Sequence, residues 1–460
     1  MILSIIVIYM VAMLLIGWWV SKRYVKGMTD FLLAGRRLGI WLAAATLAAT
    51  HFGGGAVMGG GEYGFKYGIS GAWYGVSCGI GLLLLILTAE RFRALAIYTV
   101  PDYLEERYGG KTIRVLGALL SLVALIGILA AQVLAARSAL SIIGLKGNTG
   151  AIVATLIFII YTTTGGLWAV TITDFFQLAL ATVGVIIGTV IVLVKTGGFA
   201  GLSAALSSKG VDPSFFSFWG MGTASIMWLL LPTVMYTLIG QDFYQRLLAT
   251  KDPKTAKGAA LLGGVILIII SFFPTIIGMG AKALSNEDLG RMSVPWVLQN
   301  LMHPLLGGII LSAILAAIMS TADSLLTAAT SHIVKDLWIE TYKFSKLSDE
   351  KALLFISRVF TLVIGILSLI IALIVPGIID ALIYSYTMYT AGVFIPVIGG
   401  ILWKGATRAG AITSLVGGAA LALYGIVTGA QFLGMPAEIY SALLSLFLFI
   451  LVSVITRKEA

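Results

Sequence analysis

One helix-length apolar stretch, Leu315–Leu326, carries hydroxyl groups and a carboxylate that a lipid-facing helix would exclude. Four of its residues recur at positions i, i+3, i+4 and i+7 and therefore share one helix face: Ala317, Ser320, Thr321 and Ser324. A backbone carbonyl and three hydroxyls on one face suit a small hard cation, which prefers oxygen ligands. The alternative is that each hydroxyl bonds to a carbonyl one turn earlier in its own helix, as is common in membranes.

Two acidic residues lie in or beside apolar segments. Asp323 is one turn from Ser320, and a carboxylate at mid-membrane costs roughly 2.5–3.5 kcal/mol on insertion scales. This carboxylate therefore requires a cation, a proton or another partner. Asp174 lies in the segment Gly165–Gln177, and its alternative role is the N-cap of the helix that follows.

Two apolar segments contain helix-breaking residues. Thr46–Gly61 has six glycines and a histidine, which predicts a discontinuous helix whose free backbone groups bind a ligand. The alternative is close packing of helices through small residues. Trp228–Gln241 contains Pro232 and Gly240 and predicts a second break, five spans after the first.

Polar and aromatic residues in the apolar segments are candidates for contact with a transported molecule. His51 could donate a hydrogen bond, although a structural imidazole is an equal alternative. Gly53 belongs to the unwound run with free N–H groups. The remaining candidates, for which packing is the alternative, are Gln132, Tyr236, Gln241, Tyr386 and Tyr389.

The composition places this chemistry in a lipid bilayer. Of 460 residues, 59% are hydrophobic and 11% are charged, with a mean hydropathy of +1.03, which is typical of a polytopic all-α membrane protein. We expect one membrane domain over 1–460, without a soluble domain, and a first helix that is retained. The apolar windows predict thirteen transmembrane helices, near 2–20, 40–60, 70–89, 114–136, 149–167, 171–194, 223–241, 257–281, 304–331, 353–375, 377–403, 408–428 and 437–456.

The basic residues predict the topology. If the first helix starts outside the cell, 23 of the 30 lysines and arginines fall on the inside. The sequence therefore predicts a multi-pass protein of the cell membrane with its N-terminus outside and its C-terminus in the cytoplasm. The net charge of +10 requires no nucleic-acid partner, because the basic residues are spread over separate loops. The inside group includes Arg246, Lys343, Lys346 and Lys458, and the outside group includes Lys146.

Several function classes lack their residues in this sequence. It has one cysteine, Cys78, no Cys/His spacing for a metal, no phosphate-binding loop and no nucleophile beside a base. We therefore expect neither an enzyme nor an organic cofactor. A channel would need a continuous polar pore, whereas the polar groups cluster in two or three segments.

Four motifs resemble those of a known family, the sodium:solute symporters: Asp30–Arg36, Gly165–Gln177, Gly240–Arg246 and Ala317–Ser324. The resemblance covers nearly the whole chain and implies symport of a small organic solute with Na⁺ by alternating access. It also implies a LeuT-like fold of two inverted five-helix repeats, here 38–195 and 220–430. An extra first helix with its loop (1–37) and an extra last helix (436–460) flank the repeats.

The resemblance also implies cation sites. One sodium ion would be held by the backbone of Ala49, Phe52 and Ala317 and by the side chains of Ser320 and Thr321. Some family members hold a second sodium, whose site maps here to Asp174, Ser320, Asp323 and Ser324. Since Asp323 replaces a hydroxyl found in those members, this second site could hold sodium, share a proton, or form a carboxylate pair with a raised pKa.

The resemblance says less about the solute than about the fold and the cation sites. His51 stands where relatives have Asp, Asn or Trp, so neither the proline pattern nor the sugar pattern transfers. We expect an amino acid or a carboxylate, bound by the N–H groups of the unwound segment and by His51. One alternative is a proton-coupled carrier that uses Asp174 and Asp323. Another is a choline-type sodium symporter, because the run Thr50–Gly55 looks closest to the choline carriers.

Overall fold

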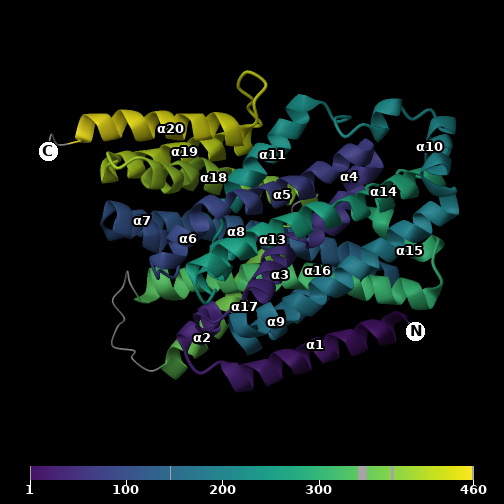
Figure 1. Ribbon diagram of the computed structural model, residues 1–460, viewed down its shortest axis with the longest axis horizontal. Coiled ribbons are helices and arrows are strands. Elements are labelled where there is room, and N and C mark those ends of the chain that lie inside the picture. Colours follow the sequence, from purple (N-terminus) through teal and green to yellow (C-terminus); the bar gives the residue numbers. More distant parts are fainter. Residues whose placement is uncertain (1, 146, 340–349, 375–377, 458–460) are drawn as a thin grey trace.

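The protein is an almost entirely helical bundle in a computed structural model, which describes residues 2–145, 147–339, 350–374 and 378–457 (Figure 1). β structure among these residues is limited to two isolated bridges, Leu38–Thr250 and Phe432–Met435. Lys146, Lys343, Lys346 and Lys458, which entered the count of basic residues, lie outside the described residues. So do residues 375–377, where the predicted window 353–375 ends and the window 377–403 begins.

The helices follow the predicted windows. The first half of the chain contains α1 (Ile2–Tyr24), α2 (Met28–Leu33), α3 (Ile40–His51), α4 (Gly60–Tyr67), α5 (Trp73–Leu84), α6 (Ile86–Ala94), α7 (Val100–Tyr108), α8 (Lys111–Leu140), α9 (Asn148–Thr196) and α10 (Gly198–Ser208). The second half contains α11 (Thr223–Thr237), α12 (Gln241–Leu248), α13 (Pro253–Ile270), α14 (Phe272–Leu284), α15 (Ser293–Asn300), α16 (Pro304–Ser331), α17 (Glu350–Ile374), α18 (Ile378–Leu402), α19 (Arg408–Thr428) and α20 (Ala437–Thr456).

The number of spans depends on how interrupted helices are counted. Within the described residues, ten helical runs are long and apolar enough to cross a membrane, and the bent pair α11–α12 would make an eleventh. Ile40–His51 and Asn148–Ile160 are apolar but too short to qualify alone. The all-α polytopic fold class is confirmed, and the predicted count of thirteen is approximate. α1 begins and α20 ends at opposite ends of the bundle, as an odd number of crossings requires (Figure 1).

The first predicted break is present. α3 ends at His51, and Phe52 leaves the helix with φ −80° and ψ 51° before a π-helical turn, Gly55–Gly59, leads into α4. Packing requires a glycine at 53, because a Cβ there would lie 2.1 Å from Thr321 Oγ1 of α16. The broken segment therefore lies against protein, the condition under which unwound backbone persists in a membrane.

The second break lies at Gly240 and not at the proline. α11 ends at Thr237, α12 begins at Gln241, and the two helices are bent by 42°. Pro232 lies inside α11, five residues before the end of this helix. The prediction that Pro232 marks a break was therefore wrong. A proline inside a membrane helix is tolerated where neighbouring groups satisfy the backbone that it frees.

The fifth and sixth predicted windows form one helical run, α9, with a kink at Gly166. Gly166 has φ 56° and ψ −163°, a conformation that favours glycine, and a Cβ there would lie 2.5 Å from the ring of Phe31. Asp174 lies eight residues beyond this kink, in the helix interior. The alternative role of Asp174 as an N-cap is therefore excluded.

α16 is the central helix of the bundle. Every residue from Ile310 to Ser331 is buried, and α16 packs against α9, α8, α1 and α3 (Figure 1). Helices at the periphery instead expose large apolar side chains such as Leu15, Phe355 and Val427. An apolar exterior around a polar centre is the arrangement expected in a bilayer.

A buried charge cluster ties α7 and α8 to the segment after α16. The Arg114 guanidinium pairs with Asp102, with Glu105 at 2.6 Å and with Asp336 at 2.9 Å. His332 Nδ1 lies 2.8 Å from the other Asp336 oxygen, and Thr99 donates to Asp336 at 2.8 Å. The cluster lies at the end of the bundle that the basic-residue bias predicts to be cytoplasmic.

We expect Arg114→Met to destabilise the fold by about 3–5 kcal/mol, because it leaves three carboxylates without their shared cation. The measurement is the thermal unfolding midpoint in detergent. Lys257→Met is the matched control, since the Lys257–Glu90 pair is about half exposed and an exposed pair contributes only about 0–1 kcal/mol. An Arg114→Met protein that melts no lower than the control would contradict a structural role for the cluster.

Candidate cation and solute site

The end of α3 meets the hydroxyl stripe of α16 at one point. Ser320 Oγ donates to the carbonyls of Ala317 at 2.9 Å and Ala49 at 3.2 Å. Thr321 Oγ1 lies 3.1 Å from the Ala49 carbonyl and 3.4 Å from that of Ala317. Four oxygens predicted to ligate sodium therefore converge. The hydroxyls also bond within their own helix, as the alternative considered for them requires.

These hydroxyls remain able to bind a cation. A hydroxyl oxygen has two lone pairs and a rotatable hydrogen, so it can face a cation while its hydrogen donates elsewhere. Phe52 is the C-cap residue of α3, and its side chain is fully buried. Its carbonyl therefore stands at the break. All five residues are buried away from lipid and water.

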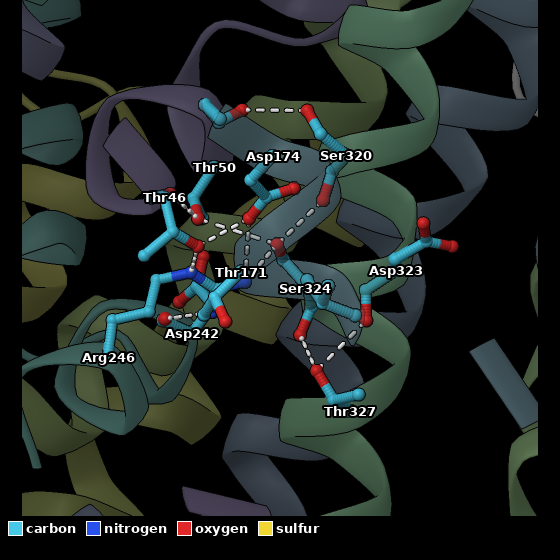
Figure 2. A network of polar contacts seen from close by, with 12 residues as sticks. Thr46, Thr50, Thr171, Asp174, Asp242, Arg246, Ser320, Asp323, Ser324 and Thr327 are labelled. Carbon is cyan, nitrogen blue, oxygen red and sulfur yellow. Dashed lines mark hydrogen bonds and ion pairs between the residues drawn. The ribbon is translucent and has the colours of Figure 1, made fainter. Parts of the chain in front are cut away.

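A second polar cluster lies one turn further along α16 (Figure 2). The buried Arg246 guanidinium of α12 lies 3.7 Å from Asp174 Oδ2, and it donates to Thr46 Oγ1 at 2.9 Å and to Ser324 Oγ. Thr46 in turn donates to Asp174. Arg246 therefore links α3, α9, α12 and α16, and it contacts two of the four residues predicted for a second sodium, Asp174 and Ser324.

Asp323 lies apart from this guanidinium, and its carboxylate points away from Arg246 (Figure 2). Thr162 Oγ1 donates to Asp323 Oδ1 at 2.7 Å. Asp323 Oδ2 and Asp174 Oδ1 are both buried and have no hydrogen-bond partner among the residues that the structure describes. Asp174 and Asp323 thus have different hydrogen-bond partners, although the two carboxylates act on each other electrostatically.

Sequence reasoning assigned Arg246 to an inside loop, and the structure corrects this. Its side chain is fully buried, because all eight residues of α12 fold back into the bundle after the break at Gly240. One signal was available: Asp242 and Arg246 are spaced i, i+4 directly after a helix breaker. Thr46 and Thr162 were also missed. Thr46 is a single threonine among apolar residues, and Thr162 is one of three consecutive threonines that no pattern tells apart.

A narrow cavity lies beside the predicted sodium site. It is bounded by residues of the broken segment, α5, α8, α11, α12, α16 and α18: Thr50, His51, Gly55, Tyr74, Ile128, Gln132, Tyr236, Asp242, Phe243, Thr321, Leu382 and Tyr386. Four predicted solute contacts are among them, namely His51, Gln132, Tyr236 and Tyr386. Thr321 belongs both to this wall and to the predicted cation site.

The cavity wall is built from paired side chains. His51 Nε2 lies 3.0 Å from Thr237 Oγ1, and the His51 ring stacks on Phe243 with centroids 4.2 Å apart. Gln132 Oε1 accepts a hydrogen bond from the N–H of Gly54 at 2.7 Å, so the amide satisfies backbone freed by the break. These partners hold the wall in place.

Three predicted solute contacts do not line this cavity. Gln241 accepts from the N–H of Val100 at 2.9 Å and donates to the Tyr98 carbonyl, so it joins α12 to α7. The Tyr389 hydroxyl donates to the Ile239 carbonyl at 2.8 Å, at the second break. Gly53 packs against Thr321 and presents backbone only.

Comparisons with known proteins agree with this architecture. The family model of the sodium:solute symporter family matches residues 31–418. The osmoregulated proline transporter OpuE of Bacillus subtilis (strain 168) is 28% identical over 476 residues, covering 98% of this chain and 94% of the relative. The sodium/proline symporter of Escherichia coli (strain K12) is 27% identical over 471 residues, covering 95% and 92%. These relatives are transporters and not enzymes.

A solved structure shares the fold. The substrate-bound, outward-open state of a Na⁺-coupled sialic acid symporter superposes with a TM-score of 0.83 at 20% sequence identity, covering 100% of this chain and 98% of that one. The predicted LeuT-like fold is thereby confirmed. With a family match over most of its length, the chain belongs to the sodium:solute symporter family.

Proposed function

We propose that this protein takes up a small organic solute, an amino acid or a carboxylate, with sodium bound by Ala49, Phe52, Ala317, Ser320 and Thr321. The observation that carries the proposal is the position of Thr321. Its hydroxyl contacts the Ala49 carbonyl at 3.1 Å, and the same residue lines the cavity that contains His51 and Gln132. An ion at this point would therefore order one wall of the solute site.

Coupling follows from where the ion would bind. A sodium ion between the α3 break and α16 would hold these two elements together and complete the cavity, so solute and ion would favour the same state. Rocking of the repeats 38–195 and 220–430 would then expose both to the cytoplasm. At a membrane potential of about 100 mV, each sodium ion supplies roughly 2.3 kcal/mol.

The solute class is supported by the cavity and by the relatives. One relative is named as a proline transporter and another as a sodium/proline symporter, and each is similar to this chain over more than nine tenths of its length. The cavity is narrow, and eight of its twelve lining residues carry a polar group on the side chain, which suits a compact polar solute. We place the protein in the cell membrane, with its N-terminus outside and its C-terminus in the cytoplasm.

We expect Ser320→Ala and Thr321→Ala each to raise the sodium concentration for half-maximal uptake by about tenfold or more. The reason is that a hydrogen-bonding group directed at a charge contributes about 1.5–3 kcal/mol. The measurement is uptake into proteoliposomes over a sodium titration. Ser312→Ala is the matched control, because Ser312 is buried in the same helix and its hydroxyl donates to the Gly308 carbonyl one turn earlier. Unchanged sodium dependence in both site variants would refute the assignment.

One observation favours a second candidate, a proton-coupled carrier: the buried Asp323 has an oxygen without a partner among the described residues. A proton on this carboxyl would remove a buried charge. Sodium bound at Ser320 and Thr321 would instead require no change in the protonation of Asp323.

We expect accumulation under an inward sodium gradient, and none under a proton gradient without sodium. The measurement is uptake of labelled proline, alanine, lactate, pantothenate, choline and glucose into proteoliposomes under each gradient. Accumulation driven by protons alone, and abolished by Asp323→Asn, would favour the proton-coupled carrier over sodium symport. Accumulation of choline alone would favour the choline-type symporter.

A further inference from the structure

Asp242 places a carboxylate in the wall of the solute cavity. It lies in the first turn of α12, two residues after the break at Gly240, and is 2% exposed. The carboxylate folds back over the break, since a Cβ at Gly240 would lie 2.7 Å from Asp242 Oδ1. His51, Tyr236 and Tyr386 line the same cavity. An acidic group therefore faces the space that a solute would occupy.

This carboxylate is buried without an ion pair. The Tyr236 hydroxyl donates to Asp242 Oδ1 at 3.0 Å, and within the described residues no basic side chain forms an ion pair with Asp242. Arg246 is near in sequence, but its NH1 donates to the main-chain carbonyl of Asp242 at 2.7 Å. The rest of that guanidinium is directed at Asp174, Thr46 and Ser324.

A buried carboxylate of this kind is stabilised by a cation that enters the cavity. Aromatic rings line the same cavity. The rings of Tyr236 and Tyr386 stack with centroids 4.5 Å apart, and the Tyr386 hydroxyl lies 3.3 Å from the Tyr74 hydroxyl. Since the two stacked faces cover each other, the Asp242 carboxylate is the group that attracts a cation, and the Tyr236 hydroxyl holds this carboxylate in place.

Another part of the wall adjoins the proposed cation site. Thr321 lines the cavity, and its hydroxyl also contacts the Ala49 carbonyl at the proposed sodium site. A bound sodium ion would make this part of the cavity positive. The cavity would then have a negative pole at Asp242 and a positive pole at Thr321, which matches a zwitterion.

We infer that Asp242 binds the cationic nitrogen of the solute and thereby selects zwitterionic amino acids over monocarboxylates and sugars. The solute carboxylate then faces Thr321 and the sodium ion. This inference rests on the proposed function and narrows its solute class. It also assigns a role to a residue that sequence reasoning did not single out.

Two pairs of compounds test the nitrogen directly. L-alanine and L-lactate differ by an amino and a hydroxyl group, and L-proline and tetrahydrofuran-2-carboxylate differ by the ring nitrogen. Each is tested in proteoliposomes as an inhibitor of the uptake of the labelled amino acid that the protein accumulates. Within the pair that inhibits more strongly, we expect the compound with nitrogen to inhibit at a concentration at least tenfold lower than the compound without it. Equal inhibition by its partner would overturn the inference.

Asp242→Asn tests the residue. Asparagine keeps the size of the side chain and can still accept the hydrogen bond from the Tyr236 hydroxyl, but it lacks the charge. We expect a loss of at least tenfold in apparent affinity for the amino acid and little change for the analogue without nitrogen. Asp242→Glu should recover part of the affinity. Glu90→Gln is the matched control, because Glu90 is a half-exposed acidic residue that does not line the cavity.

A sodium-dependent rise in thermal stability, measured without solute, separates this inference from the proposed function. If Asp242→Asn keeps the rise and loses amino-acid affinity, the inference is supported. If it keeps both, the inference is overturned while sodium symport stands. If the wild-type protein shows no such rise and no sodium-driven uptake, the proposed function fails and the inference fails with it.

Discussion

Unwound backbone between α3 and α4 must find hydrogen-bond partners inside a membrane, where no water supplies them. The partners come from two neighbouring helices. The Ala49 carbonyl receives Ser320 and Thr321 from α16, and the Gly54 N–H receives Gln132 from α8. The glycines that permit the break also permit this contact, because any side chain at 53 would collide with Thr321. The polar groups that stabilise the break are therefore the groups at the candidate cation and solute sites.

The second constraint is electrostatic. Asp174, Asp242 and Asp323 are buried near one another, and Arg246 is the one basic group that acts on all three among the described residues. Its fixed geometry of five donors lets it bond to several helices at once. The cluster still carries more negative than positive charge when all three carboxylates are ionised. Such a centre favours the entry of cations, and this agrees with a protein whose family moves sodium.

Sequence patterns predicted what lies within single helices. The period of Ala317, Ser320, Thr321 and Ser324 identified one polar face of α16, and the glycine run identified the first break. Patterns could not show which distant helix meets that face. Arg246 was assigned to a loop because the return of α12 into the bundle depends on the second break, which is a tertiary feature. Gln241 and Tyr389 were chosen for their residue type alone, and both bond to backbone elsewhere.

The kink in α9 has a mechanical consequence. The arm before Gly166 carries Thr162, which holds Asp323, and the arm after it carries Asp174, which meets Arg246. The backbone conformation of Gly166 therefore sets how the arm with Thr162 and the arm with Asp174 lie relative to each other. Phe31 of α2 lies against Gly166, so a displacement of the chain before α3 would change the angle between the two arms of α9.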